Sequence, residues 1–378
     1  MNSIIGVETS IALFAGLASS GPTDRAVQLN SFADYQREFG GLDRVTLLGY
    51  SVKHFFENGG AEAYALRITG GSGDSSADKG LILDTASPDF HAGLLASFGP
   101  GSITDEIDLF NLVCVPGLAD AATISALQQH CVARRAFLIV DCAETATSAT
   151  VSGSLAAISG PHARNSALYF PWVRASDPLQ PGTHRNFPPC GFVAGVFARI
   201  DRDRALWKAP AGSEARINGA VAPSIAIGDT ENARLNPQAV NCLRALSIFG
   251  TVIWGARTLH GDNARASEWK YVPVRRTALF LEESLYRGTQ WVVHEPNDEP
   301  LWAQIRLSIG AFMQNMFRKG AFQGSSPRSA YFVKCDGETT TLADINRGIV
   351  NILVGFAPLK PAEFVIIKVQ QNAGGIPG

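Results

Sequence analysis

Residues 109–141 read LFNLVCVPGLADAATISALQQHCVARRAFLIVD, and this stretch decides the class of fold. Apolar runs predict a strand over Leu109–Val115 and a second strand over Phe137–Asp141. Between them a Pro-Gly turn leads into a helix that Asp120 caps and that ends near Arg135. Two strands joined by a crossover helix lie parallel in one sheet, with the helix over one face. The stretch therefore predicts a βαβ unit.

On the N-terminal side of this unit the pattern stays α/β. Period and turn residues predict a strand, two helices and a further strand over Ile11–Ala18, Phe32–Phe39, Thr46–Glu57 and Tyr64–Thr69. Residues 70–78 (GGSGDSSAD) follow, and they predict a flexible loop or the root of a small insertion near 70–100. A phosphate-binding loop is the weaker alternative, because neither GxxxxGK[ST] nor GxGxxG occurs there.

On the C-terminal side the pattern is less regular at first. A strand is predicted over Ala167–Val173, glycine and proline stay frequent to about Pro237, and residues 259–266 resemble a linker. The last third is clearer. It predicts helices over Arg276–Arg287 and Pro300–Lys319, a short helix that Thr341 begins, and strands over Trp291–His294, Tyr331–Lys334 and Ile349–Phe356.

The final predicted strand is apolar on both faces. It consists of Phe364, Val365, Ile366, Ile367, Lys368 and Val369. A strand of this kind has to be covered on both faces and paired along its edges. Two interpretations stay open: the strand closes the sheet of its own subunit, or it is an arm that adds to the sheet of a neighbouring subunit.

Composition excludes several classes of function. The chain has 378 residues, 46% of them hydrophobic, and a formal net charge of −2 from 32 basic and 34 acidic side chains. Near-neutrality argues against a dedicated nucleic-acid binder and permits packing against further copies. No run of 18 uncharged apolar residues occurs, so no membrane insertion is expected. The six cysteines stand singly, without metal-ligand spacing, as in reduced cytoplasmic proteins, and we expect no metal and no cofactor.

The best candidate for catalysis is the group His294, Glu295, Asp298 and Glu299. Carboxylates beside a histidine can act as general acid and base or can bind a metal. The alternative is structural, because Asp298 and Glu299 flank a predicted helix start and complement its dipole. This alternative is favoured, and we expect no enzyme activity. Two basic pairs, Arg134-Arg135 and Arg275-Arg276, are expected to be solvated or to lie in interfaces.

Short segments along the whole chain carry a family resemblance. Near the start they are Gly6-Val7-x-Thr9-Ser10, Ser31-Phe32-x-Asp34-Tyr35, Phe39-Gly40-Gly41 and His54-Phe55-Phe56-x-Asn58-Gly59-Gly60. In the middle they are Tyr169-Phe170-Pro171-Trp172, Trp207-Lys208-Ala209-Pro210-Ala211-Gly212, Leu235-Asn236-Pro237, Asn241-Cys242-Leu243-Arg244 and Trp254-Gly255-Ala256-Arg257-Thr258-Leu259. In the last third they are Glu282-Glu283-Ser284, Gly288-Thr289-Gln290-Trp291-Val292-Val293, Glu295-Pro296-Asn297-Asp298-Glu299-Pro300-Leu301-Trp302 and Pro361-Ala362-Glu363-Phe364-Val365-Ile366. In this order the segments resemble the contractile tail sheath family of phages and related injection machines.

The resemblance implies a structural subunit in hexameric rings, stacked helically around a tail tube. It implies an α/β outer domain (residues 1–260), an α+β inner domain that faces the tube (261–360) and a C-terminal linking arm (361–378), with mixed sheets and an exchanged C-terminal strand. The implied partners are further copies, the tail tube protein, the baseplate and the tail terminator. Assembly in the bacterial cytoplasm into a virion tail or injection particle follows. Arg318 and Lys319, at a helix end in the inner domain, are candidate contacts to the tube.

The start of the sequence departs from the family pattern. Relatives usually carry a proline- and valine-rich arm, often with Pro-Gly-Val-Tyr, ahead of the Gly-Val-x-Thr-Ser segment, whereas here only Met1–Ile5 precede Gly6. A natural short form and the loss of a linking arm are both compatible with this. The C-terminal strand is therefore the better candidate for linking subunits. The short 70–100 segment also predicts that large outer decoration domains are absent.

Overall fold

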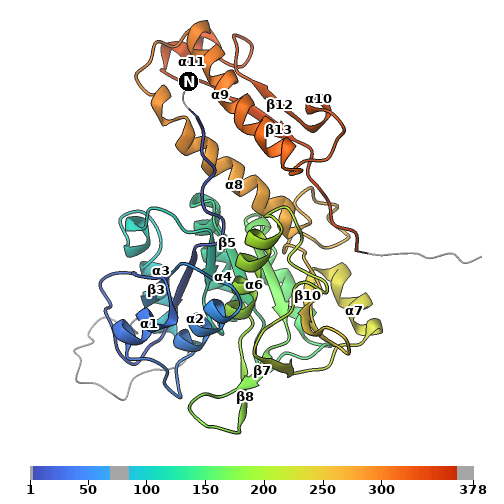
Figure 1. Ribbon diagram of the computed structural model, residues 1–378. Helices are drawn as coiled ribbons and strands as arrows, with labels where there is room; N and C mark the ends of the chain where they lie inside the picture. The colour runs from blue at the N-terminus through green and yellow to red at the C-terminus, as the bar shows by residue number, and fades with distance from the viewer. Residues whose placement is uncertain (1–2, 69–84, 364–378) are drawn as a thin grey trace, which may run out of the picture.

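The computed structural model describes residues 3–68 and 85–363 and has two parts, with one long helix passing between them (Figure 1). The lower unit is built on an eight-stranded sheet, and the upper unit is built on the long helix α9 and a two-stranded sheet. Helix α8 (Val272–Gly288) runs from the lower unit into the upper one. The predicted loop at 70–78 and the predicted strand Phe364–Val369 lie outside the described residues.

The large sheet is mixed, with strand order β11-β10-β6-β5-β4-β1-β3-β2. Strands from β10 to β3 in this order run parallel, while β11 and β2 are antiparallel edge strands. The predicted βαβ unit is confirmed, because β4 and β5 are parallel neighbours joined through α4. The strands are β1 (Ala12–Gly16), β2 (Val27–Leu29), β3 (Ala63–Arg67), β4 (Leu112–Cys114), β5 (Phe137–Asp141), β6 (Ser166–Phe170), β10 (Val240–Leu246) and β11 (Gly250–Ile253).

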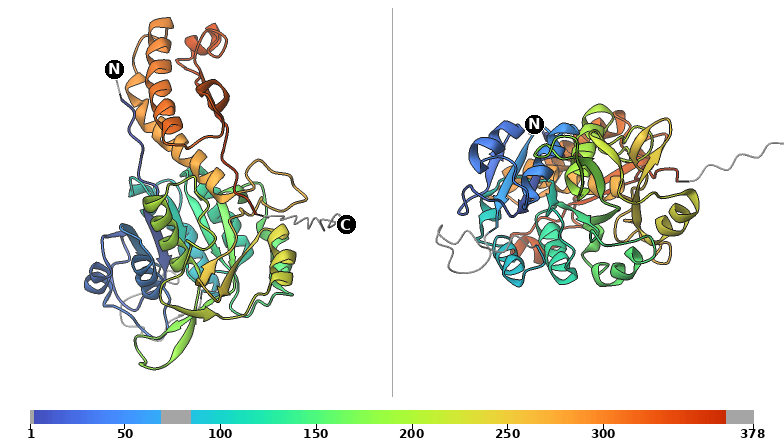
Figure 2. Two further views of the ribbon diagram at one scale, coloured as in Figure 1. Left: turned by 45° about the vertical axis from the view of Figure 1, so that its right-hand side comes forward. Right: turned by 90° about the horizontal axis from the view of Figure 1, so that it is seen from below.

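Helices cover both faces of this sheet (Figure 2). Alternate residues of each strand point to opposite faces, and they enter two separate hydrophobic clusters: Phe14 and Ile139 pack in one, Leu13 and Val140 in the other. The first cluster contains α1 (Phe32–Phe39), α2 (Leu48–Glu57) and α6 (Cys190–Asp203). The second contains α3 (Pro88–Ala96), α4 (Ala121–Ala133), α5 (Leu155–Ile158) and the end of α7 (Asp229–Leu235).

Helix α6 is the longest element that the sequence did not predict. Its residues 190–198 are all buried, so it has no polar stripe that would mark a helical period. It packs against α2 through its glycines. A Cβ at Gly191 would lie 2.4 Å from the carbonyl oxygen of Ser51, and one at Gly195 would lie 2.5 Å from that of Phe55. The two helix backbones therefore touch, which only glycine allows at these two positions.

Two predicted strands are corrected. The strand over Ala167–Val173 ends at Phe170, because Pro171 follows and cannot donate to the ladder. The chain resumes as β7 (Val173–Ser176), which pairs with β8 (His184–Phe187) and β9 (Ala220–Pro223) in a small sheet. The predicted strand over Trp291–His294 is wrong. Residues 290–292 form a 3₁₀ turn, and His294 has a φ of 74°, outside the β region.

The upper unit has a hydrophobic cluster of its own. Helix α9 (Glu299–Arg318) confirms its predicted apolar stripe, which is buried against α8 and the sheet of β12 (Tyr331–Lys334) and β13 (Leu353–Phe356). Two short helices complete it, α10 (Pro327–Ala330) and α11 (Leu342–Asn346). Ile4, from the other end of the chain, joins this cluster against Gly288. Residues 4–7 therefore pack beside α8.

The base of α8 is fixed in the lower unit by two buried arginines. Arg276 forms a two-pronged ion pair with Asp201 of α6 at 2.9 and 2.6 Å, and both side chains are 4% exposed. Arg275 donates from Nε to Asn165 Oδ1 at 2.7 Å. The expectation that the Arg275-Arg276 pair is solvated or interfacial is therefore wrong. Their partners lie far away in the sequence, so the local pattern gave no sign of them.

No helix within residues 3–68 and 85–363 has both the length and the apolar character needed to cross a membrane. All six cysteines are buried free thiols.

The Arg276–Asp201 pair yields a stability prediction. Asp201→Ala leaves a buried guanidinium without its counter-charge and should lower the free energy of unfolding by about 3–5 kcal/mol. The matched control is Glu214→Ala, which breaks an exposed pair with Arg204 and should cost less than about 1 kcal/mol. Urea unfolding followed by tryptophan fluorescence measures both, and equal losses in the two variants would contradict a special role for the buried pair.

Candidate functional site

A cluster of hydrogen-bonded polar side chains surrounds Glu363, the last residue that the structure describes, beside the lower unit. Arg257, which is 1% exposed, donates from Nε and Nη2 to the two carboxylate oxygens of Glu363, both at 2.7 Å. This is a bidentate pair, the strongest geometry that arginine and carboxylate adopt. We call it the Arg257–Glu363 clamp. It joins the segment after β11 to the segment after β13.

Further side chains complete the clamp. Tyr271 donates its hydroxyl to Glu363 Oε2 at 3.1 Å and Asn236 donates to Oε1 at 3.3 Å, while Arg257 Nη1 reaches Asn263 Oδ1 at 2.9 Å. Burial alone would raise the pKa of Glu363, but the hydrogen bonds and charge of Arg257 outweigh it and the pKa is lowered. The carboxylate is therefore held ionised, and its contribution to stability is lost as the pH falls through its depressed pKa.

Asn241 of β10 holds the arginine end of the clamp in place. Its amide accepts from the Arg257 N–H at 2.7 Å and donates to the Arg257 carbonyl at 2.7 Å. A Cβ at the intervening Gly255 would lie 2.8 Å from Asn241 Oδ1, so the close approach needs glycine. The segments 241–244 and 254–259, which the sequence showed only as separate motifs, meet here.

A groove of about 520 Å³ lies beside the clamp, and we call it the arm-root groove. Aromatic side chains and small residues line it, and the segment 359–363 forms one wall. Its lining comes from four of the segments that carry the family resemblance, including Trp207, Ala211, Asn236, Trp254 and Ala362. The motifs in the sequence include these residues but do not show that they converge, because the order of strands in the large sheet brings them together.

A second feature is the two-stranded sheet of the upper unit. Within the described residues, β12 and β13 pair with each other and with no further strand. On its outer face Phe332 and Leu353 are both 53% exposed. Two-stranded sheets are marginal on their own, and unpaired strand edges are templates for further strands. This sheet is therefore a candidate acceptor for an added strand.

The other predicted site residues have different outcomes. Arg318 and Lys319 lie at the end of α9, and neither makes an ion pair with any residue the structure describes. The strand residues Phe364, Val365, Ile366, Ile367, Lys368 and Val369 follow directly on Glu363 and lie outside the described residues.

Two residues of the His294 group, Asp298 and Glu299, lie at the start of helix α9. Asp298 accepts the backbone N–H of Leu301 at 3.2 Å as the N-cap of α9, and Glu299 pairs with Arg306 at 2.6 Å. The structural interpretation of these carboxylates is confirmed.

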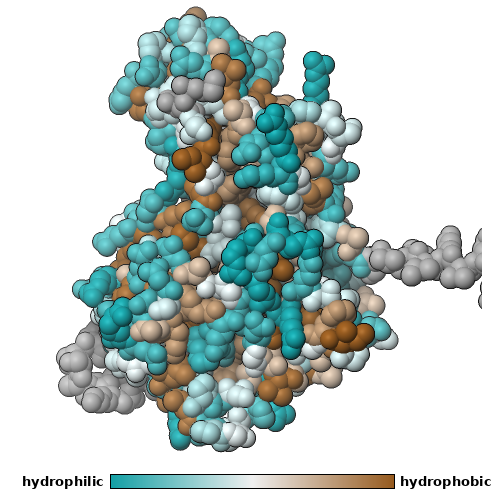
Figure 3. Space-filling model, in the orientation of Figure 1, coloured by the Kyte–Doolittle hydropathy of each residue, from teal (hydrophilic) through white to brown (hydrophobic). Residues whose placement is uncertain are grey.

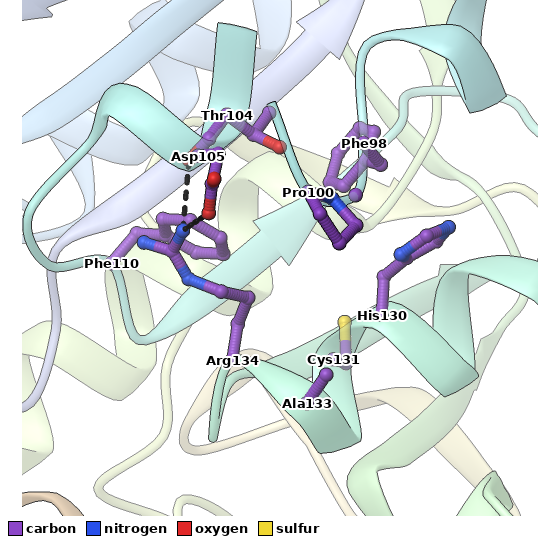
Figure 4. Close-up of a pocket in the computed structure, with 10 residues that line it drawn as sticks. Phe98, Pro100, Thr104, Asp105, Phe110, His130, Cys131, Ala133 and Arg134 are labelled. Atoms are coloured by element: carbon purple, nitrogen blue, oxygen red, sulfur yellow. Dashed lines mark hydrogen bonds and ion pairs between the residues drawn. The ribbon is translucent and has the colours of Figure 1, made fainter. Parts of the chain in front are cut away.

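A smaller cavity of about 210 Å³ opens between α4 and the 98–105 segment (Figure 4). Arg134 is turned toward Asp105, 3.2 Å away, and lies over the Phe110 ring on the opposite side of the cavity from His130. It also donates to the carbonyl oxygen of Ile107. Arg134, expected to be solvated or interfacial, is thus an internal support for this loop.

The carboxyl edge of the parallel strands is where α/β folds hold ligands. Here Asp141, at the end of β5 and 2% exposed, accepts the N–H groups of Gly117 at 3.0 Å and Cys190 at 2.8 Å. It thereby ties the turn after β4 to the start of α6. A cavity of only about 70 Å³ lies at this edge, lined by residues such as Leu47, Leu48 and Pro116. Burial raises the pKa of Asp141 to about 7, against the opposing effect of the two N–H donors.

Comparison with known proteins points to one family. The family model described as phage tail sheath protein central domain matches residues 98–259, and the phage tail sheath C-terminal domain matches residues 265–372. The tail sheath protein of Burkholderia phage BcepMu is 26% identical over 161 residues, which is 42% of this chain and 33% of that protein. The chain thus matches about a third of the length of this curated relative.

Solved structures agree over nearly the whole chain. The sheath complex of PVC, an extracellular contractile injection system in its contracted state, is 27% identical with a TM-score of 0.79, over 99% of this chain and 94% of that one. The contracted helical sheath of the anti-feeding prophage is 27% identical with a TM-score of 0.75, over 98% and 95%. The same system's 6-fold symmetrised baseplate gives 26% identity and a TM-score of 0.75, over 98% and 95%.

The clamp yields a prediction on stability. Glu363→Ala removes the counter-charge of a buried arginine and should lower the free energy of unfolding by about 3 kcal/mol or more. Tyr271→Phe, which removes one hydrogen bond to the same carboxylate, should cost about 0.5–1.5 kcal/mol. Urea unfolding checks both, and a Glu363→Ala loss no larger than that of Tyr271→Phe would show that the clamp is not the main support.

Asp141 yields a prediction on pH dependence. Because its folded pKa lies above the unfolded one, its protonated form favours folding below about pH 4, and this stabilisation is lost as the pH rises through about 7. Asp141→Asn keeps an oxygen acceptor but cannot ionise. The melting temperature of Asp141→Asn minus that of the wild type should therefore increase from pH 5 to pH 8. A difference that does not change with pH would contradict this assignment.

Proposed function

The chain belongs to the contractile tail sheath family, and on that premise we propose that it is the sheath subunit of a contractile tail or injection particle. Hexameric rings of this subunit stack helically around a tail tube. Subunits then rearrange as rigid bodies into a shorter, wider array and drive the tube through the target envelope. Interface free energy drives the change, and the two units move between two packings without refolding.

The relatives support the ring and the helix. The solved structures that resemble this chain include a 6-fold symmetrised baseplate and a contracted helical sheath. Repeated copies in a helical array need heterologous contacts, in which different surfaces meet. On the face drawn in Figure 3, hydrophilic surface is interrupted by apolar patches near the waist between the two units and toward the lower edge. Apolar patches of this kind are typical of association surfaces.

In this proposal the lower unit, residues 1–260, is the outer domain and the upper unit, residues 261–360, is the inner domain facing the tube. The base of α8 packs into the lower unit even though it follows residue 260 in sequence. Arg318 and Lys319, free of ion pairs with the described residues, are then candidates to meet acidic groups on the tube. The baseplate lies at one end of the array and the tail terminator at the other. Assembly takes place in the bacterial cytoplasm.

Subunits are linked in this proposal by strand exchange. Residues 364–369 of one copy add to an edge of the β12–β13 sheet in a neighbour, where main-chain hydrogen bonds give affinity and side-chain positions give register. One observation carries this proposal: a two-stranded sheet without further strands among the described residues, in a chain whose two-faced apolar segment follows a fixed anchor. The anchor also limits which residues can be exchanged. The exchanged segment begins after Glu363, because Glu363 belongs to the clamp of its own subunit.

The test is a pair of truncations. Removing residues 364–378 keeps the clamp and should leave a folded subunit that forms no tubes in negative-stain electron microscopy. Removing residues 361–378 also deletes Glu363 and should lower the melting temperature, because Arg257 is then buried without a partner.

A point variant distinguishes the effect of losing the strand's apolar face from the effect of shortening the chain. Ile366→Asp puts a charge on one apolar face and should prevent tube formation while the subunit stays folded. Normal tubes from the subunit lacking residues 364–378 would overturn the exchange.

A further inference from the structure

The arm-root groove has the lining of a site for an apolar segment. Trp207, Trp254 and Tyr271 are each partly exposed along it, and Ala211 and Ala256 form small-residue surface between them. Apolar and aromatic walls with a few polar groups are what binding clefts of this size present. One polar group stands out: the Oδ1 atom of Asn232 is buried and accepts no hydrogen bond from the described residues.

We infer that, in the unassembled subunit, this groove holds the chain's own residues 364–369. The inference rests on the proposed function in one respect, namely that the same segment leaves the groove for a neighbouring sheet during assembly. The groove is then a resting site for the arm, and the subunit is latent until a neighbour takes the strand.

Connectivity supports this occupant over any other. The segment 359–363 forms a wall of the groove, and the clamp fixes Glu363, the residue to which the proposed occupant is covalently joined. A tether this short gives an effective local concentration of about 1 mM or more. Before assembly, a segment from a second copy is present at only its bulk concentration. The tethered segment therefore has the advantage in any dilute solution of subunits.

The apolar character of residues 364–367 also supports this segment as the occupant of the groove. Phe364, Val365, Ile366 and Ile367 are apolar on both strand faces, and leaving such a segment in water would favour aggregation. The groove has aromatic side chains and small residues in its walls, and these can cover apolar side chains of the segment.

The consequence is a competition between two sites for one strand. Docking in the groove is intramolecular and independent of concentration, whereas addition to a neighbour's sheet is intermolecular and also gains a ladder of main-chain hydrogen bonds. Weakening the groove should therefore lower the concentration at which tubes form. Locking the strand into the groove should prevent tubes altogether.

The experiment uses disulfide trapping in the full-length chain. The pair Ile366→Cys with Ala211→Cys places one thiol on the segment and one in the groove. The control pair is Ile366→Cys with Ala264→Cys, which lies in the exposed loop next to Asn263 and outside the groove lining. The six native cysteines are buried, which keeps background exchange low. Monomer purified at micromolar concentration is oxidised mildly, and non-reducing electrophoresis with peptide mass spectrometry separates intramolecular from intermolecular bonds.

We expect the groove pair to form its intramolecular disulfide at least tenfold faster than the control pair. Equal rates, or bonds only between copies, would overturn the docking. If Ala211→Cys disturbs the circular dichroism spectrum, Ala209→Cys, which lines the same groove, replaces it.

A second step separates this inference from the proposed function. The oxidised groove pair should form no tubes, and reduction should restore them. Tubes from the oxidised protein would overturn the competition between the two sites. Fast trapping together with no tubes from any reduced or wild-type sample would instead overturn the proposed function and leave the docking standing.

Discussion

The ion pair of Arg276 with Asp201 fixes the position of the upper unit relative to the lower unit. Around it Thr9 accepts a hydrogen bond from Arg276 at 2.9 Å and Ser10 donates to Asp201 at 2.9 Å, so the start of the chain, α6 and α8 meet at one charged site. Neither charge can be removed without leaving the other buried and unpaired. The base of α8 is therefore fixed, and the remaining turns of this 17-residue helix carry the upper unit at a set position.

The Arg257–Glu363 clamp follows the same logic at a different place. In both cases a guanidinium from the segment after the large sheet is buried, and a carboxylate from a distant segment neutralises it. One pair holds the body of the upper unit, and the other holds the point where the chain leaves that unit. Because the two are separate, a force on the end of the chain is delivered to the lower unit through Arg257 and does not pass through the packing of α8 and α9. A subunit built this way can be linked to neighbours and still move as a rigid body.

Local patterns predicted about half of the helices and strands and few of the contacts that place them. The βαβ unit, the helix capped by Ser31 and the apolar stripe of α9 are each set by residues within one element, and each is confirmed. Helix α6 was missed because its residues 190–198 are apolar on every side. The clamp escaped because Arg257 and Glu363 lie 106 residues apart, and the pairing of Arg276 escaped because Asp201 lies 75 residues away. A local sequence pattern does not show whether a charged side chain is solvated or is paired with a residue far along the chain. The motifs around 207, 236, 254 and 361 marked the right residues for the site, but only the fold shows that they share one groove.

The clamp also affects which end of the proposed linking arm detaches first under load. In the proposed strand exchange the anchor and the exchanged strand would act in series, so the arm would transmit a load only as far as its weaker end permits. A strand at a sheet edge is held by main-chain hydrogen bonds, each of which water can replace at a net cost of about 1 kcal/mol. The anchor is held by a bidentate pair around an arginine that is 1% exposed, and water cannot replace Glu363 without entering the interior. Opening the anchor therefore requires exposing a buried charge, whereas opening the strand proceeds one hydrogen bond at a time. On this reasoning the anchor outlasts the strand pairing, and the strand is the part of the arm suited to change partners.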